Sequence, residues 1–135
     1  MEAKFSIIKN DILGKKYSLS IAYVDEKTSR EINKKYRQKN KPTNILSFPL
    51  TKNKGEIVLC EAAIRKDTKK FGMTFDHLLG FLVIHGMLHL KGHEHSSTME
   101  ALEEKYDQKY FGRDRRGLLD DESRGGRVSK RRKKS

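Results

Sequence analysis

Apolar residues along this chain are gathered into short segments, and strongly charged stretches separate these segments. Alternating or short apolar runs bounded by turn-forming residues are typical of strands. Four segments have this pattern: 5–8, 17–24, 44–50 and 56–60. The first two are predicted to pair across a loop at Gly14, and the last two to form a hairpin around the polar turn 52–55. The pattern therefore predicts a small sheet of four strands.

Apolar residues at helical spacing, together with capping residues, predict four helices. These helices are expected over residues 26–38, 61–71, 75–91 and 97–111. Asp25 and Thr74 precede two of them as N-caps, and Ser97 with Glu100 has the spacing of a capping box for the last. The helix over 75–91 is apolar nearly all round, which predicts that it is the central, buried helix.

An excess of basic residues narrows the range of partners. The 135 residues include 30 Lys or Arg against 18 Asp or Glu, which gives a net charge of +12. Such a charge attracts polyanions through phosphate neutralisation and counterion release, so nucleic acid is the expected partner. No apolar run approaches the roughly 20 residues that span a bilayer, so we expect a soluble protein with no membrane partner.

The cysteine content and the first residues predict the cellular location. Cys60 is the only cysteine and ends an apolar segment, so it is interpreted as a small buried side chain without chemistry. Residues 1–10 lack the charged start and the apolar centre of a secretory signal. Both features predict a cytoplasmic protein.

The composition changes at Arg113. The last 23 residues contain ten Lys or Arg, four Asp or Glu and only three apolar residues, too few to bury a core. We therefore expect a domain over 1–112 and a basic, disordered tail over 113–135, each with a net charge of +6. The tail is either a solvated extension or an RNA-anchoring arm, and its last basic run also has the composition of a nuclear-localisation segment. We favour non-specific affinity for RNA.

Histidines are concentrated in the segment 85–95, which reads HGMLHLKGHEH. His85 and His89 are four residues apart, so they project from one helix face about 6 Å apart along the axis. Gly92 allows the chain to leave the helix, so that His95 can fold back as a third ligand. Three neutral imidazoles suit Zn²⁺ and leave the fourth tetrahedral position open, as in catalytic sites.

Other interpretations of these histidines remain. His93 is an alternative third ligand to His95, and His77, two turns before His85, is interpreted as structural. Core histidines satisfied by hydrogen bonds are the plainer explanation for one such residue. Burying three near apolar neighbours without a shared ligand would leave ring nitrogens unpaired, at roughly 1–3 kcal/mol each. We therefore favour metal binding.

The histidine segment has the spacing of the zinc-protease motif HExxHxxGxxH, but Gly86 occupies the position of the glutamate general base. This difference argues against peptide hydrolysis. The segment instead resembles the pattern HGxLHLxGxDH of the YbeY family of rRNA maturation endoribonucleases. The resemblance extends to NKKYR at 33–37, KPTNILSFP at 41–49 and GEIVLC at 55–60.

The resemblance implies an α+β fold in which a small mixed sheet packs against helices and the central helix carries the metal motif, as in zincin-like proteins. It implies that His85, His89 and His95 hold one Zn²⁺ and that Arg37 lies in the cleft, where its charge suits a phosphate. Glu94 replaces the family's usual aspartate and is assigned to orient a water or a ligand. Zinc acidifies bound water, which would offset the missing glutamate.

The function implied is that of a single-strand-specific endoribonuclease in 16S rRNA 3′-end maturation and ribosome quality control. The partners implied are rRNA of the small subunit and ribosomal proteins. An alternative is an RNA-binding assembly factor with a structural zinc, and a weaker one is a metal hydrolase of small molecules. Two departures from the family stand out: the N-terminal region has little room for the family's usual helix between the first two strands, and the basic tail has no counterpart.

Overall fold

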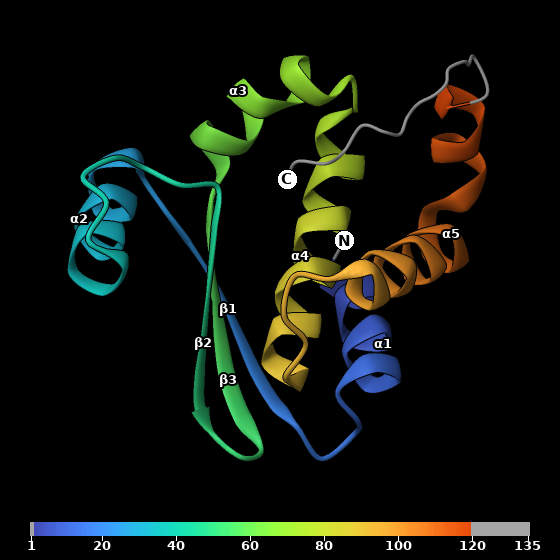
Figure 1. Cartoon of the computed structure of the whole chain (residues 1–135), viewed down its shortest axis with the longest axis horizontal. Coiled ribbons are helices and arrows are strands. Elements are labelled where there is room, and N and C mark those ends of the chain that lie inside the picture. The colour runs from blue at the N-terminus through green and yellow to red at the C-terminus, as the bar shows by residue number, and fades with distance from the viewer. Residues whose placement is uncertain (1, 120–135) are drawn as a thin grey trace.

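The computed structural model describes residues 2–119 of the chain (Figure 1). These residues form five helices and three strands in this order: α1 (Glu2–Ile12), β1 (Ser18–Val24), α2 (Glu26–Arg37), β2 (Ile45–Thr51), β3 (Lys54–Cys60), α3 (Glu61–Phe71), α4 (Phe75–Lys91) and α5 (Ser97–Leu119). Helices and a mixed sheet in one unit make this an α+β fold, as predicted.

The sheet is built around β3. This strand pairs with β1 in parallel and with β2 antiparallel, so Ile57 lies between Ile21 and Ser47. The hairpin predicted from the polar turn is present as β2 and β3. The sheet has three strands within residues 2–119, not the four predicted, and β1 and β2 are its edges.

The missing strand is a helix. Residues 5–8 were predicted to form a strand paired with 17–24, and this prediction is wrong because they belong to α1. Phe5, Ile8 and Ile12 are buried at intervals of three and four residues, whereas Ile7 is 58% exposed. This is a helical period, and α1 packs its buried face on α4. The N-terminal region, which was expected to have little room for a helix, therefore contains one before β1.

Helix α4 is the centre of the fold, as its apolar composition predicts. Thr74 caps its first turn by accepting a hydrogen bond from the amide of His77, and Gly92 ends it in the left-handed conformation at φ 110°. Helices α1, α3 and α5 surround it on one side of the sheet (Figure 1). The main core lies between them and consists of these buried residues: Phe5, Ile8, Ile12, Ile57, Leu59, Ile64, Leu78, Leu79, Leu82, Val83, Ile84, Met87, Leu88 and Met99.

Helix α2 covers the opposite face of the sheet (Figure 1). Asp25 caps it as predicted, accepting a hydrogen bond from the amide of Thr28 at 2.8 Å. Two buried polar residues of α2 hold the segment that leads into β2. Ser29 exchanges hydrogen bonds with the backbone of Thr43, and the amide of Asn33 donates to the carbonyl of Lys41 at 2.8 Å. These hydrogen bonds give Ser29 and Asn33 a structural role.

Helix α5 differs from its prediction at both ends. Its first turn is capped by Ser96, whose hydroxyl accepts a hydrogen bond from the amide of Met99, so the predicted capping box at Ser97 and Glu100 is wrong. The helix continues past the expected end at Phe111 to Leu119. The rest of the predicted tail, 120–135, lies outside the described residues, so its disorder stays a prediction.

Within the described part of the chain, no single helix is both long and apolar enough to cross a membrane. Helices α3 and α4 meet these criteria only when taken together, and they are bent by 106° where they join.

Candidate metal centre

Three histidines converge where α4 ends. His85 and His89 lie one turn apart on α4, and His95 lies in the loop that follows Gly92. Their ring centroids are 4.5 Å apart for His85 and His89, and 5.1 Å from each of these to His95. One ring nitrogen of each lies within 4.8 Å of the others. The three side chains are therefore placed to bind one metal ion.

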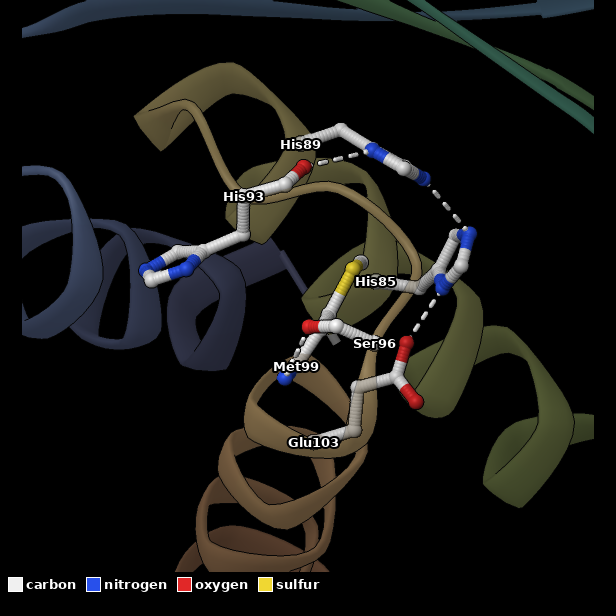
Figure 2. A network of polar contacts seen from close by, with 6 residues as sticks. All are labelled: His85, His89, His93, Ser96, Met99 and Glu103. Atoms are coloured by element: carbon white, nitrogen blue, oxygen red, sulfur yellow. Dashed lines mark hydrogen bonds and ion pairs between the residues drawn. The ribbon is translucent and has the colours of Figure 1, made fainter.

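Hydrogen bonds fix which nitrogen of each α4 histidine faces the centre (Figure 2). Nδ1 of His85 contacts the carboxylate of Glu103, and Nδ1 of His89 lies 3.0 Å from the carbonyl oxygen of His93. A carbonyl and a carboxylate accept, so each Nδ1 carries the hydrogen and each Nε2 is left with a lone pair. The two Nε2 atoms are 3.1 Å apart. Two lone pairs at this distance repel each other unless a shared proton or a metal ion lies between them, and the nearby ring of His95 supplies the third nitrogen that a metal ion needs.

The spacing agrees with a small divalent ion. Tetrahedral coordination with bonds of about 2.0 Å places neighbouring ligand atoms about 3.3 Å apart, close to the separation of the two Nε2 atoms. His95 is exposed in the loop after α4, and one of its ring nitrogens lies within 4.8 Å of the facing nitrogens of the other two histidines. Burial lowers the pKa of His89, and the ring of His85 lowers it further. A lowered pKa keeps His89 in the neutral form that a metal requires.

The structure separates the competing histidines. His93 contributes its backbone carbonyl to His89, and its ring points away from the other two rings (Figure 2). His77 is buried near the start of α4, where its ring lies 6.1 Å from that of Phe111. Neither ring belongs to the cluster, so the geometry favours His95 as the third ligand.

Gly86 has a steric reason to be a glycine. A Cβ atom at this position would lie 2.8 Å from the Ser47 hydroxyl oxygen and 3.0 Å from Cδ1 of Ile45, both on β2. The helix approaches the strand too closely for any larger side chain without rearrangement. The glutamate that zinc proteases place here would require these side chains to shift, which agrees with the argument against peptide hydrolysis.

Glu103 is a site residue that the sequence interpretation missed. It is only 9% exposed, and it shares a buried face of α5 with Met99 and Asp107, each four residues apart. A helix face that buries two carboxylates is unusual, because such groups are almost never buried without partners. The spacing of Met99, Glu103 and Asp107 was the signal in the sequence that could have identified Glu103. It did not reveal the partner, because His85 lies on another helix.

The two predicted catalytic residues occupy different parts of the fold. Arg37 is exposed and is the last residue of α2, a helix that lies on the opposite side of the sheet from α4 (Figure 1). Glu94 is exposed in the loop between His93 and His95. Their catalytic roles stay predictions.

The fold and the histidine cluster together define an α+β protein in which three histidines, two on the central helix and one in the loop after it, are placed to bind a metal ion. The family model described as Endoribonuclease YbeY matches residues 3–111. The chain belongs to the YbeY family.

Individual relatives agree with this assignment. The chain is 39% identical over 95 residues to Endoribonuclease YbeY of Chelativorans, covering 64% of this chain and 58% of the relative. It is 33% identical over 120 residues to that of Lactobacillus helveticus, covering 74% and 69%. This chain therefore spans less than two thirds of the first relative.

A solved structure supports the fold. The solution structure of TM1509 from Thermotoga maritima matches with a TM-score of 0.63 and 30% identity. The match covers 93% of this chain and 89% of that one.

Proposed function

We propose that this protein is a single-strand-specific endoribonuclease that uses one Zn²⁺ held by His85, His89 and His95. Its substrate is rRNA of the small subunit, with 16S 3′-end maturation and ribosome quality control in the cytoplasm as its role. The observation that carries the proposal is the pair of Nε2 lone pairs facing each other at 3.1 Å. Membership of a family named for endoribonuclease activity and the charge of +12 support RNA as the substrate.

The chain's own residues have distinct parts in this proposal. When bound, Zn²⁺ supplies Lewis acidity that polarises a phosphoryl oxygen and acidifies water. Glu103 keeps the hydrogen of His85 on Nδ1 and so aims Nε2 at the ion. Arg37 binds a phosphate of the substrate through its guanidinium fork, and Glu94 orients a water or a ligand.

Two observations favour a second function. Glycine stands at position 86 in place of the glutamate base, and α2, which ends at Arg37, lies on the far side of the sheet from α4. Both facts suit an RNA-binding ribosome-assembly factor in which zinc holds the loop after α4 to that helix and catalysis is weak. The same basic surface serves either function.

Cleavage of a single-stranded RNA with the sequence of a 3′-extended small-subunit rRNA separates the two. We expect zinc-loaded protein to cleave this RNA and to leave its duplex form intact. His89→Ala should abolish cleavage, and Arg37→Ala should slow it about hundredfold. Arg30→Ala, which removes another exposed cation of α2, is the matched control and should retain activity.

Each other outcome has a defined meaning. Binding of RNA without cleavage, equal in wild type and His89→Ala, establishes the assembly factor. Full cleavage by Arg37→Ala removes Arg37 from the active site. Hydrolysis of a small phosphodiester without cleavage of RNA supports a small-molecule hydrolase.

A further inference from the structure

An exposed aromatic pair lies at the end of α2. Tyr36 is 60% exposed, although a large aromatic ring gains stability from burial. Its ring meets that of Phe48 on β2 edge-on, with centroids 5.1 Å apart and an interplanar angle of 64°. The packing against Phe48 holds Tyr36 in place while leaving much of its ring open to solvent. A held, accessible ring of this kind is suited to stacking with a flat ligand.

The segment that carries Tyr36 is rich in cations, and one of them lies beside its ring. Residues 27–41 contain seven Lys or Arg, all exposed, and only one acidic residue, Glu31. Two of the cations, Lys34 and Lys35, occupy the last turn of α2, and Nζ of Lys35 lies 5.5 Å from the centroid of the Tyr36 ring. A solvated positive surface around an aromatic ring matches the chemistry of a nucleic acid, which presents phosphates and flat bases together.

The aromatic pair lies on one face of β2, and α4, which carries His85 and His89, lies on the other face. Phe48 and Ser47 are neighbours on β2, so their side chains point to opposite faces of the sheet. Phe48 contacts Tyr36 on the α2 face, and Ser47 lies against Gly86 on the α4 face, next to His85. Because β2 is an edge of the sheet in the described part of the chain, a flexible single-stranded nucleic acid can pass around it from one face of the sheet to the other.

We propose that Tyr36, Phe48, Lys34 and Lys35 form a docking surface for single-stranded RNA. In this arrangement a base stacks on Tyr36, and the lysines contact the flanking phosphates. The bound strand continues around β2 toward the three histidines. This inference rests on the proposed function, because it assigns the surface that holds the substrate of that site.

The surface discriminates single strands from duplexes. A base in a duplex is stacked on both sides within the helix and cannot stack on Tyr36, whereas an unpaired base presents its face. Stacking accepts every base, so binding here has little sequence preference, and the lysine contacts make it depend on salt.

Binding of fluorescein-labelled oligoadenylate, followed by fluorescence anisotropy with the full chain, tests the surface. Tyr36→Ala should weaken binding about tenfold, and Tyr36→Phe should restore it, because a phenyl ring still stacks. Lys34→Gln with Lys35→Gln should reduce the slope of log affinity against log salt by about 1.4, the value for two single-strand phosphate contacts.

Matched controls test whether RNA binding depends on this surface or only on the positive charge of the protein as a whole. Lys69→Gln with Lys70→Gln removes two adjacent exposed lysines from the last turn of α3, and it should change affinity and salt slope much less. An oligonucleotide with 2-aminopurine should lose fluorescence on binding wild type, as a stacked base does, but keep it with Tyr36→Ala. Vesicles of anionic phospholipid serve as a second probe.

Several results would overturn the inference. Equal losses from the two lysine pairs, or unchanged binding by Tyr36→Ala, would show that no specific surface exists here. Loss of vesicle binding but not of RNA binding in Tyr36→Ala would assign the surface to a membrane. Failure of wild type to bind oligoadenylate even at low salt would refute the proposed function itself, whereas binding by wild type and all variants alike refutes the docking surface alone.

Discussion

Glu103 on α5 and His85 on α4 are joined by a hydrogen bond between the carboxylate and Nδ1, although 18 residues separate them in the chain. The carboxylate is nearly buried, and the bond directs the Nε2 lone pair of His85 toward that of His89. Helix α5 is therefore part of the metal centre, although it supplies no ligand.

Removal of Glu103 should weaken metal binding without removing a ligand. We expect Glu103→Ala to raise the zinc dissociation constant about 10- to 100-fold, because the ring of His85 loses its fixed tautomer and orientation. Glu103→Gln should have a smaller effect, since the amide oxygen still accepts the bond. Competition with a chromophoric chelator measures the constants. Glu104→Ala, an exposed neighbour, is the control, and an equal effect there would contradict the role of Glu103.

Gly86 and Gly112 are both helical glycines, but alanine should have opposite effects at the two positions. Gly86→Ala places a Cβ atom 2.8 Å from the Ser47 hydroxyl and should lower the free energy of unfolding by about 1–3 kcal/mol. At Gly112 the nearest atom, Cβ of Gln108, would be 3.5 Å away. There alanine should stabilise the metal-free protein by up to about 1 kcal/mol through helix propensity. Urea unfolding tests both, and a neutral Gly86→Ala would contradict the close approach of α4 to β2.

Gln38 ends α2 with φ 60° and ψ 32°, the left-handed conformation that glycine adopts most readily. Gln38→Gly should therefore raise the free energy of unfolding, by up to about 1 kcal/mol. Gln108→Gly, in the exposed interior of α5, should instead lower it by about 1 kcal/mol. Thermal unfolding of the two variants beside wild type measures both effects. Destabilisation by Gln38→Gly would show that this residue is not left-handed in solution.

Asp11 links α1 to α5 and should make stability depend on acid. Its carboxylate accepts hydrogen bonds from Lys109 and Tyr110 at 2.7 and 2.6 Å, and these bonds hold its pKa below the ordinary 3.8. The unfolded chain then takes up the proton first, so this contribution is complete above pH 3.8 and is lost as the pH falls through the lowered pKa.

Asp11→Asn should be less stable than wild type near pH 7, and the difference should shrink as the pH falls below the ordinary carboxyl pKa of 3.8. Urea midpoints at several pH values provide the measurement. Tyr110→Phe, which removes one of the two bonds, should fall between wild type and Asp11→Asn. A difference that is constant with pH would show that the carboxylate is not stabilised in this way.

The sequence predicted the features that depend on residues close together in the chain. Asp25 and Thr74 were identified as caps because a capping side chain bonds an amide only three residues away. The histidine grouping was predicted from the four-residue spacing on α4 and from Gly92, which ends that helix at a positive φ. The β2–β3 hairpin followed from its polar turn.

Two kinds of feature could not be predicted in this way. Some depend on contacts between residues far apart in the chain, and others on a local pattern that fits two structures equally well. Residues 5–8 are too few to distinguish a strand from one turn of helix, and burial against α4 decided the outcome. Serine is a preferred capping residue at either position, so the sequence alone did not distinguish Ser96 from Ser97 as the cap of α5. Glu103 acquires its role only because α5 lies against α4.

The metal content of the purified protein tests the central claim most directly. Protein prepared without chelator should contain one equivalent of zinc by elemental analysis, and His89→Ala, which removes one of the two facing Nε2 atoms, should contain almost none. A wild-type protein without bound metal, even after zinc is added, or a His89→Ala variant that keeps its full equivalent, would contradict the account.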